Sequence, residues 1–246
     1  MKKRSTFALL AIIIAGLVIF LWQNHTPASE VNNGSTPPKQ SFNKKQYSTT
    51  DPTSIWVVVN KQHQLNPVDY APSDLVVPNI PLRVPGNESM QVRKVTATAL
   101  EQMFAAAKQQ GIDLMLSSGY RSYAYQVSLY NGYVQTQGQA TADTQSARPG
   151  YSEHQTGFAA DIEPVSKECE VDPCFGTTPE GIWLAANAYK YGFIIRYTAA
   201  DQKITGYEAE PWHIRYVGTA LSTELHSTGV QTLEQFFGIS GGAVYK

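Results

Sequence analysis

Residues 157–162 form the most constraining stretch of this sequence, because a carboxylate interrupts a run that otherwise suits the inside of a protein. The run alternates between two faces, as a β-strand does: Phe158, Ala160 and Ile162 on one face, and Gly157, Ala159 and Asp161 on the other. A charge inside a fold is costly unless it is paired. Asp161 therefore predicts a positively charged partner, and the small residues beside it leave room for one.

Hydrophobic periodicity along the chain predicts interleaved helices and strands. Helices are predicted at 92–110, 122–134 and 179–191, and two short ones close the chain. Strands are predicted at 112–116, 157–162, 193–197 and 211–217. The last two strands have the spacing of a hairpin, so the predicted fold class is α+β, with helices packed on an antiparallel central sheet.

The first 23 residues have the pattern of a membrane-targeting segment. Lys2, Lys3 and Arg4 precede an uncharged apolar run over 7–22, and its length favours an uncleaved signal anchor over a cleaved signal peptide. In both cases the chain after Gln23 is exported. We expect a single-pass protein of the cell membrane with an extracytoplasmic domain, or a secreted protein if the segment is cleaved.

A polar tether is predicted over 24–52, because this segment has almost no large apolar residue with which to build a core. One globular domain is predicted over 53–240, beginning with the β-rich run Ser54–Val59. The charge is balanced, with 19 Lys+Arg against 20 Asp+Glu. This balance excludes the basic surface typical of nucleic-acid binding, so no nucleic-acid partner is expected.

The chain has two cysteines, Cys169 and Cys174. In an exported chain, a pair this close predicts a disulfide that closes a small loop. The alternative is a pair of zinc ligands, but it lacks a second Cys or His pair at suitable spacing. We therefore expect a structural disulfide.

Two histidines, His154 and His213, each lie close to an acid in a segment otherwise built for the core. A catalytic zinc keeps three protein ligands and an open position, and a further carboxylate acts as base. His154, Asp161 and His213 fit the ligands, and Glu210 fits the base. Spacing alone leaves a structural alternative open, in which the histidines are merely hydrogen-bonded in the core. Asp161 would then pair with one of two arginines, Arg121 or Arg215.

Three sequence blocks favour the first interpretation. They are Ser117-Ser118-Gly119-Tyr120-Arg121-Ser122, then Ser152-Glu153-His154-Gln155-Thr156-Gly157 with Asp161, and Glu210-Pro211-Trp212-His213. In this order they resemble the signature blocks of the D-alanyl-D-alanine carboxypeptidases related to VanY, a zinc family that includes vancomycin-resistance enzymes and L,D-carboxypeptidases. The resemblance runs from about Trp56 to about Phe237.

The resemblance implies a role for each matching position. One Zn²⁺ per chain is implied, with His154, Asp161 and His213 as ligands and Glu210 as catalytic base. Arg121 matches an arginine that stabilises the tetrahedral intermediate or holds a substrate oxygen. Two further positions match residues that hold the C-terminal carboxylate of the peptide: Ser152 and Gln126. For Gln126, a solvent-facing place on a helix is the structural alternative.

The implied fold is the zinc fold shared by the Hedgehog signalling domain and the D,D-peptidases, and the implied substrates are peptidoglycan stem peptides ending in D-alanine. An L,D-carboxypeptidase that trims tetrapeptide stems is the main alternative, and a non-catalytic binding module is a weaker one. Two acids near the site are left off the catalytic list: Glu153 is expected in a supporting ion pair and Glu163 on the surface.

Overall fold

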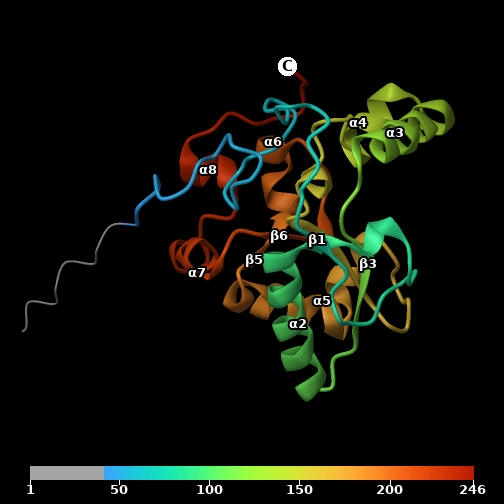
Figure 1. The fold of residues 1–246 in the computed structure, drawn as a ribbon, viewed down its shortest axis with the longest axis vertical. Helices are drawn as coiled ribbons and strands as arrows, with labels where there is room; N and C mark the ends of the chain where they lie inside the picture. Colours follow the sequence, from blue (N-terminus) through green and yellow to red (C-terminus); the bar gives the residue numbers. More distant parts are fainter. Residues whose placement is uncertain (1–41) are drawn as a thin grey trace, which may run out of the picture. The chain divides into compact units, whose positions relative to one another are not determined.

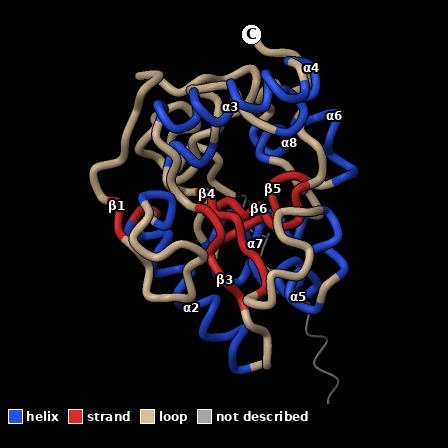
Figure 2. The backbone as a smooth tube through the Cα atoms, turned by 90° about the vertical axis from the view of Figure 1, so that its right-hand side faces the viewer, coloured by secondary structure: helices blue, strands red, loops and turns tan. Residues whose placement is uncertain are grey.

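A four-stranded antiparallel sheet runs through the computed structural model, which describes residues 42–246. In spatial order its strands are β3 (Leu114–Ser118), β4 (Ala159–Pro164), β6 (Glu210–Tyr216) and β5 (Phe193–Tyr197) (Figure 2). A small second sheet pairs β1 (Leu75–Val76) with β2 (Val92–Arg93). The predicted class, helices packed on an antiparallel sheet, is confirmed.

The main core is formed by this sheet and two helices, α2 (Lys94–Gln109) and α5 (Pro179–Asn187). On β4, alternation sends Ala160 and Ile162 into this core, while Asp161 takes the opposite face. The same core cluster contains Leu100 and Met103 of α2, Leu116 of β3, Leu184 of α5 and Ile214 of β6.

The remaining helices surround the sheet at its ends and edges (Figure 1). They are α3 (Tyr123–Gln137), α4 (Gln139–Gln145), α6 (Gln202–Thr205), α7 (Thr219–Thr228) and α8 (Leu233–Phe237). Short 3₁₀ turns lie between the helices and strands: η1 (Glu88–Met90), η2 (Glu153–Thr156), η3 (Pro173–Thr177), η4 (Ala188–Tyr191) and η5 (Ala199–Asp201). The Ser122 and Thr178 side chains cap α3 and α5, because each accepts a backbone N–H bond at the start of its helix.

The β-rich run Ser54–Val59 forms no strand, although its side chains from Trp56 onward are buried. Here a side chain provides the hydrogen bonds that a neighbouring strand would otherwise provide. The Arg215 guanidinium donates to the carbonyls of Ile55 and Val57, at 3.1 and 2.8 Å. A buried carbonyl needs a partner but does not require a strand to supply it. No helix was predicted between 134 and the strand at 157–162, whereas the structure has α4 there.

The domain extends beyond both predicted boundaries. The Phe42 ring packs on Trp56 and Phe236, with centroids 5.5 and 5.4 Å apart, so residues 42–52 belong to the folded unit rather than to the tether. At the other end, residues 241–246 also contact the domain, through Tyr245 among others. No helix within residues 42–246 is long and apolar enough to cross a membrane, and the predicted anchor over 1–23 lies outside the described residues.

Cys169 and Cys174 form a disulfide in the connection between β4 and α5. The same connection contains three residues other than glycine with positive φ: Lys167, Cys169 and Val171. It also contains Phe175, which is fully buried in the main core and anchors the connection to the domain.

Because η3 and α5 are in close contact, alanine substitution should change the stability of the protein in opposite directions at two helical glycines. A Cβ on Gly181 would lie 2.0 Å from the Phe175 carbonyl oxygen, whereas a Cβ on Gly132 of α3 would meet nothing within 4 Å. We expect Gly181→Ala to lower the free energy of unfolding by about 1–3 kcal/mol. Gly132→Ala should raise it by about 0.5–1 kcal/mol, because alanine favours the helix. Urea unfolding of both variants checks this, and equal effects would contradict the packing of α5 on η3.

Candidate active site

Strand pairing brings two of the predicted ligands together. β4 and β6 are antiparallel neighbours, and their register places Asp161 directly opposite His213. Side chains of such cross-strand partners lie on the same face of the sheet, with Cβ atoms about 5 Å apart. The Nδ1 atom of His213 lies 3.2 Å from Oδ1 of Asp161. Two residues far apart in the sequence thus lie side by side in the buried part of the sheet.

His154 reaches the same place from η2. This turn ends at Gly157, which has φ of +70° and whose Cβ would meet the Arg93 side chain at 2.7 Å, so only glycine fits. The turn directs the His154 ring at the strand pair, and its Nε2 lies 3.3 Å from Oδ2 of Asp161. Donor atoms of His154, Asp161 and His213 all lie within 4.8 Å of one another, and all three residues are buried.

The free atoms of this cluster suit a metal cation. Nδ1 of His154 lies 2.6 Å from the Gly119 carbonyl and donates to it, which leaves the Nε2 lone pair facing Asp161. The Oδ1 atom of Asp161 is buried and has no hydrogen-bond partner among the described residues. A buried carboxylate oxygen beside two imidazole nitrogens is the donor set of a catalytic zinc site. The residues therefore fit the metal that the sequence predicted.

Burial and charge shift the pKa values of the cluster in different directions. Burial lowers the pKa of His154 to about 4, and Arg121 adds to this effect. Burial also disfavours the charged form of His213, but its contacts with Asp161 and Glu153 raise its pKa to about 9. The pKa of Asp161 lies well below its usual range, because its contacts with His154, His213 and Arg121 outweigh the effect of burial. The cluster thus keeps a carboxylate charged at a buried position.

Glu210 starts β6 and lies just outside the cluster. Its Oε2 is 3.5 Å from Nδ1 of His213, and its side chain is 17% exposed to solvent. Burial raises the pKa of Glu210 to about 7. Such a carboxylate can both accept and release a proton near neutral pH. Glu210 thus lies beside the predicted ligands, and its role as the base stays a prediction.

Arg121 follows β3 and contacts Asp161 directly. Its Nη2 donates to Oδ2 of Asp161 at 2.7 Å, and its Nε donates to Ser118 at 3.1 Å. Of the two arginines considered as partners of Asp161, Arg121 takes the position and Arg215 does not. Arg121 also lines the cleft in front of the cluster.

The two residues predicted to hold the substrate carboxylate differ in position. Ser152 lines the cleft beside His154. Gln126 is fully buried in α3 and is absent from the cleft wall. Its Nε2 donates to the Ala147 carbonyl at 2.7 Å and to the Ser146 hydroxyl at 3.2 Å. Gln126 therefore joins α3 to the segment after α4, which corrects both the substrate-binding and the solvent-facing prediction.

An ion network behind His213 was only partly visible in the sequence. Glu153 was expected in an ion pair, and its Oε1 accepts from Arg196 at 2.9 Å and from Arg215 at 2.8 Å. Its Oε2 lies 3.5 Å from Nε2 of His213. Burial alone would raise the pKa of Glu153, but the two guanidinium groups outweigh it and hold the pKa below its usual range. Two arginines in otherwise apolar strands were the signal for this network.

Glu163 corrects another prediction. It was expected on the surface, yet its side chain is fully buried. Arg83 explains the burial, because its Nη1 lies 3.1 Å from Oε1 of Glu163. Arg83 also pairs with Glu170 of the disulfide loop. A carboxylate buried near the end of a strand needs a partner from outside that strand, and no spacing in the sequence identified Arg83 as this partner.

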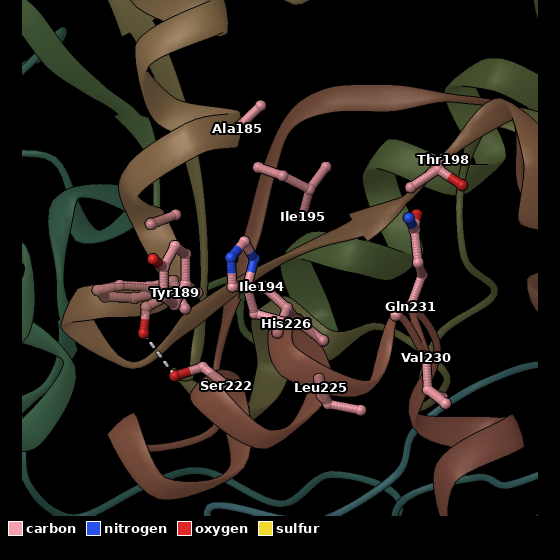
Figure 3. A pocket seen from close by; sticks show the side chains of 13 residues that line it. Ala185, Tyr189, Ile194, Ile195, Thr198, Ser222, Leu225, His226, Val230 and Gln231 are labelled. Carbon is pink, nitrogen blue, oxygen red and sulfur yellow. Dashed lines mark hydrogen bonds between the residues drawn. The ribbon is translucent and has the colours of Figure 1, made fainter.

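The cluster lies in a cleft of about 390 Å³, whose wall includes Tyr197, Tyr207 and Trp212. A second cavity, of about 320 Å³, is formed by α5, β5 and α7 and shares no lining residue with the cleft. Figure 3 shows it: the Tyr189 and His226 rings stack with centroids 3.6 Å apart, and Ser222 donates to the Tyr189 carbonyl. None of the predicted site residues lines this second cavity.

Comparison with known protein families decides the relationship. The family model of VanY, D-alanyl-D-alanine carboxypeptidase, matches residues 89–219, a range that contains all three ligand positions and Glu210. The chain belongs to the VanY family. The family expected from the three sequence blocks is therefore confirmed, and so is the enzyme class, a metallocarboxypeptidase.

Individual VanY-family relatives extend the likeness over most of the chain. A Bacillus subtilis (strain 168) protein named as a carboxypeptidase, YodJ, is 45% identical over 190 residues, which are 76% of this chain and 68% of the relative. The solved LdcB LD-carboxypeptidase is 44% identical, with a TM-score of 0.72, over 77% of this chain and 88% of the other. A vancomycin-resistance D,D-pentapeptidase VanY solved with Zn(II) is 30% identical, with a TM-score of 0.60, over 74% and 98%.

The buried Glu153 network yields a prediction about stability. Glu153→Gln removes a charge that faces two buried guanidinium groups, so we expect the free energy of unfolding to fall by about 3–5 kcal/mol. Glu208→Gln is the matched control, because Glu208 is exposed and should change stability by less than about 0.5 kcal/mol. Urea unfolding measures both. A Glu153→Gln protein as stable as the control would show that the network contributes little.

Proposed function

We propose that this protein is a zinc-dependent D-alanyl-D-alanine carboxypeptidase that removes the C-terminal D-alanine from peptidoglycan stem peptides. One observation carries the proposal: His154, Asp161 and His213 converge in a cleft with an unpartnered carboxylate oxygen, and Glu210 lies beside them. Membership of the VanY family supports the same chemistry. The single zinc and the substrate are parts of this proposal.

Three side chains would hold the zinc: His154 through Nε2, His213 through Nδ1, and Asp161 through its free oxygen. With Nδ1 of His213 given to the metal, its Nε2 carries the proton and faces Glu153, which fixes the tautomer. When bound, zinc supplies a Lewis acid that brings the pKa of a water molecule towards 7 and polarises the peptide carbonyl. The protein supplies the rest of the chemistry.

Glu210 moves the proton. It accepts a proton from the attacking water and gives it to the nitrogen of the departing D-alanine, so the peptide C–N bond breaks without a free charged amine anion. Arg121 lies on the cleft side of Asp161 and presents a fixed cation to the carbonyl oxygen as negative charge develops there. Ser152, in the cleft wall, is placed to donate to the substrate carboxylate.

A second candidate is an L,D-carboxypeptidase, which removes D-alanine from tetrapeptide stems. The likeness to the LdcB structure favours it, since that chain is 44% identical and is described as an LD-carboxypeptidase. Both substrates end in D-alanine, and both reactions use the same metal site and base. The non-catalytic alternative is weaker, because the ligands, Glu210 and Arg121 are all present and close together.

We also propose that the domain works outside the cytoplasm, attached to the membrane through the apolar segment at 7–22. The Cys169–Cys174 disulfide supports this location, because such bonds persist in oxidising compartments. A tether between this segment and Phe42 would let the cleft reach stem peptides in the cell wall. Peptidoglycan is then the physiological partner, and no nucleic acid is involved.

Stem peptides of defined length test the proposal. Purified protein loaded with zinc is incubated separately with a pentapeptide and a tetrapeptide, and products are weighed by mass spectrometry. We expect loss of one alanine from the pentapeptide, and no loss after zinc is removed with a chelator. Cleavage of the tetrapeptide alone would replace the D,D assignment with the L,D assignment. Cleavage of neither peptide would overturn the carboxypeptidase.

Glu210→Gln tests the base separately from the metal. We expect this variant to bind zinc in the parental ratio but to cleave about 10²–10⁴ times more slowly, because the amide cannot accept the proton. Elemental analysis and peptide kinetics measure the two properties. Glu208→Gln, two residues away and exposed, controls for the loss of a nearby charge. A Glu210→Gln enzyme that cleaves at the parental rate would show that another group is the base.

A further inference from the structure

The α3–α4 hairpin presents an apolar stripe to the metal cleft. Tyr125, Leu129 and Tyr133 lie four residues apart on α3, so they share one face of the helix. All three line the cleft, as do residues 145–147 at the end of α4. Tyr125 is 54% exposed, and such a ring gains little from folding. A stripe of this kind, facing a catalytic cleft, is suited to contact with a bound peptide.

The hairpin has little attachment of its own to the sheet. Within residues 42–246, α3 and α4 pack mainly against each other, and Figure 1 shows them set apart from the strands. The Tyr130 hydroxyl donates to Oδ1 of Asp143 at 2.7 Å, which joins the two helices internally. The position of the stripe over the cleft therefore depends on what holds the hairpin from outside.

Arg148 connects the hairpin to Tyr245. Its guanidinium donates twice to Asp143 on α4, with Nε–Oδ1 at 3.0 Å and Nη2–Oδ2 at 2.7 Å. The Arg148 backbone N–H donates to the Tyr245 hydroxyl at 3.0 Å, and the guanidinium lies 4.2 Å from the centre of the Tyr245 ring. The ion pair raises the pKa of Arg148, so the cation over the ring stays charged. Tyr245 thus contacts the hairpin by a hydrogen bond and by a cation–π interaction.

Tyr245 also contacts the floor of the cleft. Its hydroxyl lies 3.3 Å from that of Tyr207, a buried residue in the cleft wall. Tyr207 packs on Tyr197, and Tyr197 packs on His213, with ring centroids 5.0 and 4.9 Å apart. The ring of Tyr245 therefore joins the hairpin to the row of aromatic rings that ends at a metal ligand.

Lys61 also contacts the region where the hairpin, the cleft wall and Tyr245 meet. It is almost fully buried, and its Nζ donates to the carbonyls of Asp143 and Gly206, both at 2.5 Å. Its carbonyl accepts from the backbone N–H of Lys246 at 3.0 Å, which holds residues 245–246 in place. Four segments distant in the sequence meet here, and Tyr245 contacts both the hairpin and the cleft wall, as Lys61 does through the Asp143 carbonyl and the Tyr207 ring.

We infer that Tyr245 is a positioning residue for substrate binding: it holds the α3–α4 hairpin so that Tyr125, Leu129 and Tyr133 form the peptide-contacting wall of the cleft. The inference rests on the proposed function, because the peptide is its substrate. The metal ligands and Glu210 lie on η2, β4 and β6, outside the hairpin. Loss of the contact should therefore weaken peptide binding and leave the chemical step largely intact.

Steady-state kinetics of Tyr245→Ala on the stem peptide that the parent cleaves test this directly. We expect KM to rise about tenfold, kcat to change less than about twofold, and bound zinc to stay at the parental ratio. Tyr245→Phe keeps the ring over Arg148 and loses only the hydroxyl, so its KM should lie between the KM of the parent and that of Tyr245→Ala. Val244→Ala is the control, because Val244 is 73% exposed. An unchanged KM in Tyr245→Ala, or a fall in kcat with loss of zinc, overturns the inference.

Hydrogen exchange separates this inference from the proposed function, because it needs no activity. In Tyr245→Ala we expect faster exchange of amides over 123–145, with no change in β4 and β6. If neither stem peptide is cleaved by the parent, the proposed function fails, and this pattern still decides whether Tyr245 holds the hairpin. Parental exchange over 123–145 overturns the positioning role. If Tyr245→Ala does not fold, Tyr245→Phe gives the same comparison with a smaller change.

Discussion

The cross-strand pairing of Asp161 with His213 is the contact on which the rest of the site depends. It exists because β4 and β6 are neighbours in one particular register. A shift of one residue would turn Asp161 into the apolar core and bring Ala160 or Ile162 to the cleft. The packing of Ile162 and Ile214 against α2 and α5 opposes that shift. Hydrophobic burial on one face of the sheet therefore fixes the geometry of the charged groups on the other.

A layer of buried ions supports this pairing from behind. Glu153 and Glu234 balance Arg196 and Arg215, and each charge has at least one partner of the opposite sign at hydrogen-bond distance. Buried ions are tolerated when they are paired in this way. The network joins η2, β5, β6 and α8, and Glu153 extends it to His213. The network contacts one predicted ligand, His213, and it includes Glu153 of η2, the turn that carries another predicted ligand, His154. The same ion pairs therefore hold both the fold and the predicted metal site.

Local patterns predicted the strands of the main sheet, the helices that cover it and the residues that converge in the cleft, His154, Asp161, His213 and Glu210, because each depends on a periodicity or on a motif of neighbouring residues. The failures concern contacts between distant segments. Ser54–Val59 has strand composition, but Arg215 satisfies its carbonyls. Gln126 and Glu163 are buried by partners that no spacing identifies. Residues 241–246 look like a tail, and their role depends on Arg148 and Lys61, which the fold brings to them.

Anomalous diffraction at the zinc absorption edge, from crystals of the zinc-loaded protein, would locate the metal itself. We expect one strong peak between Nε2 of His154, Nδ1 of His213 and the Asp161 carboxylate, with Glu210 nearby but not coordinating. A peak at another place, or a coordinated zinc from which one of these three side chains points away, would contradict this expectation.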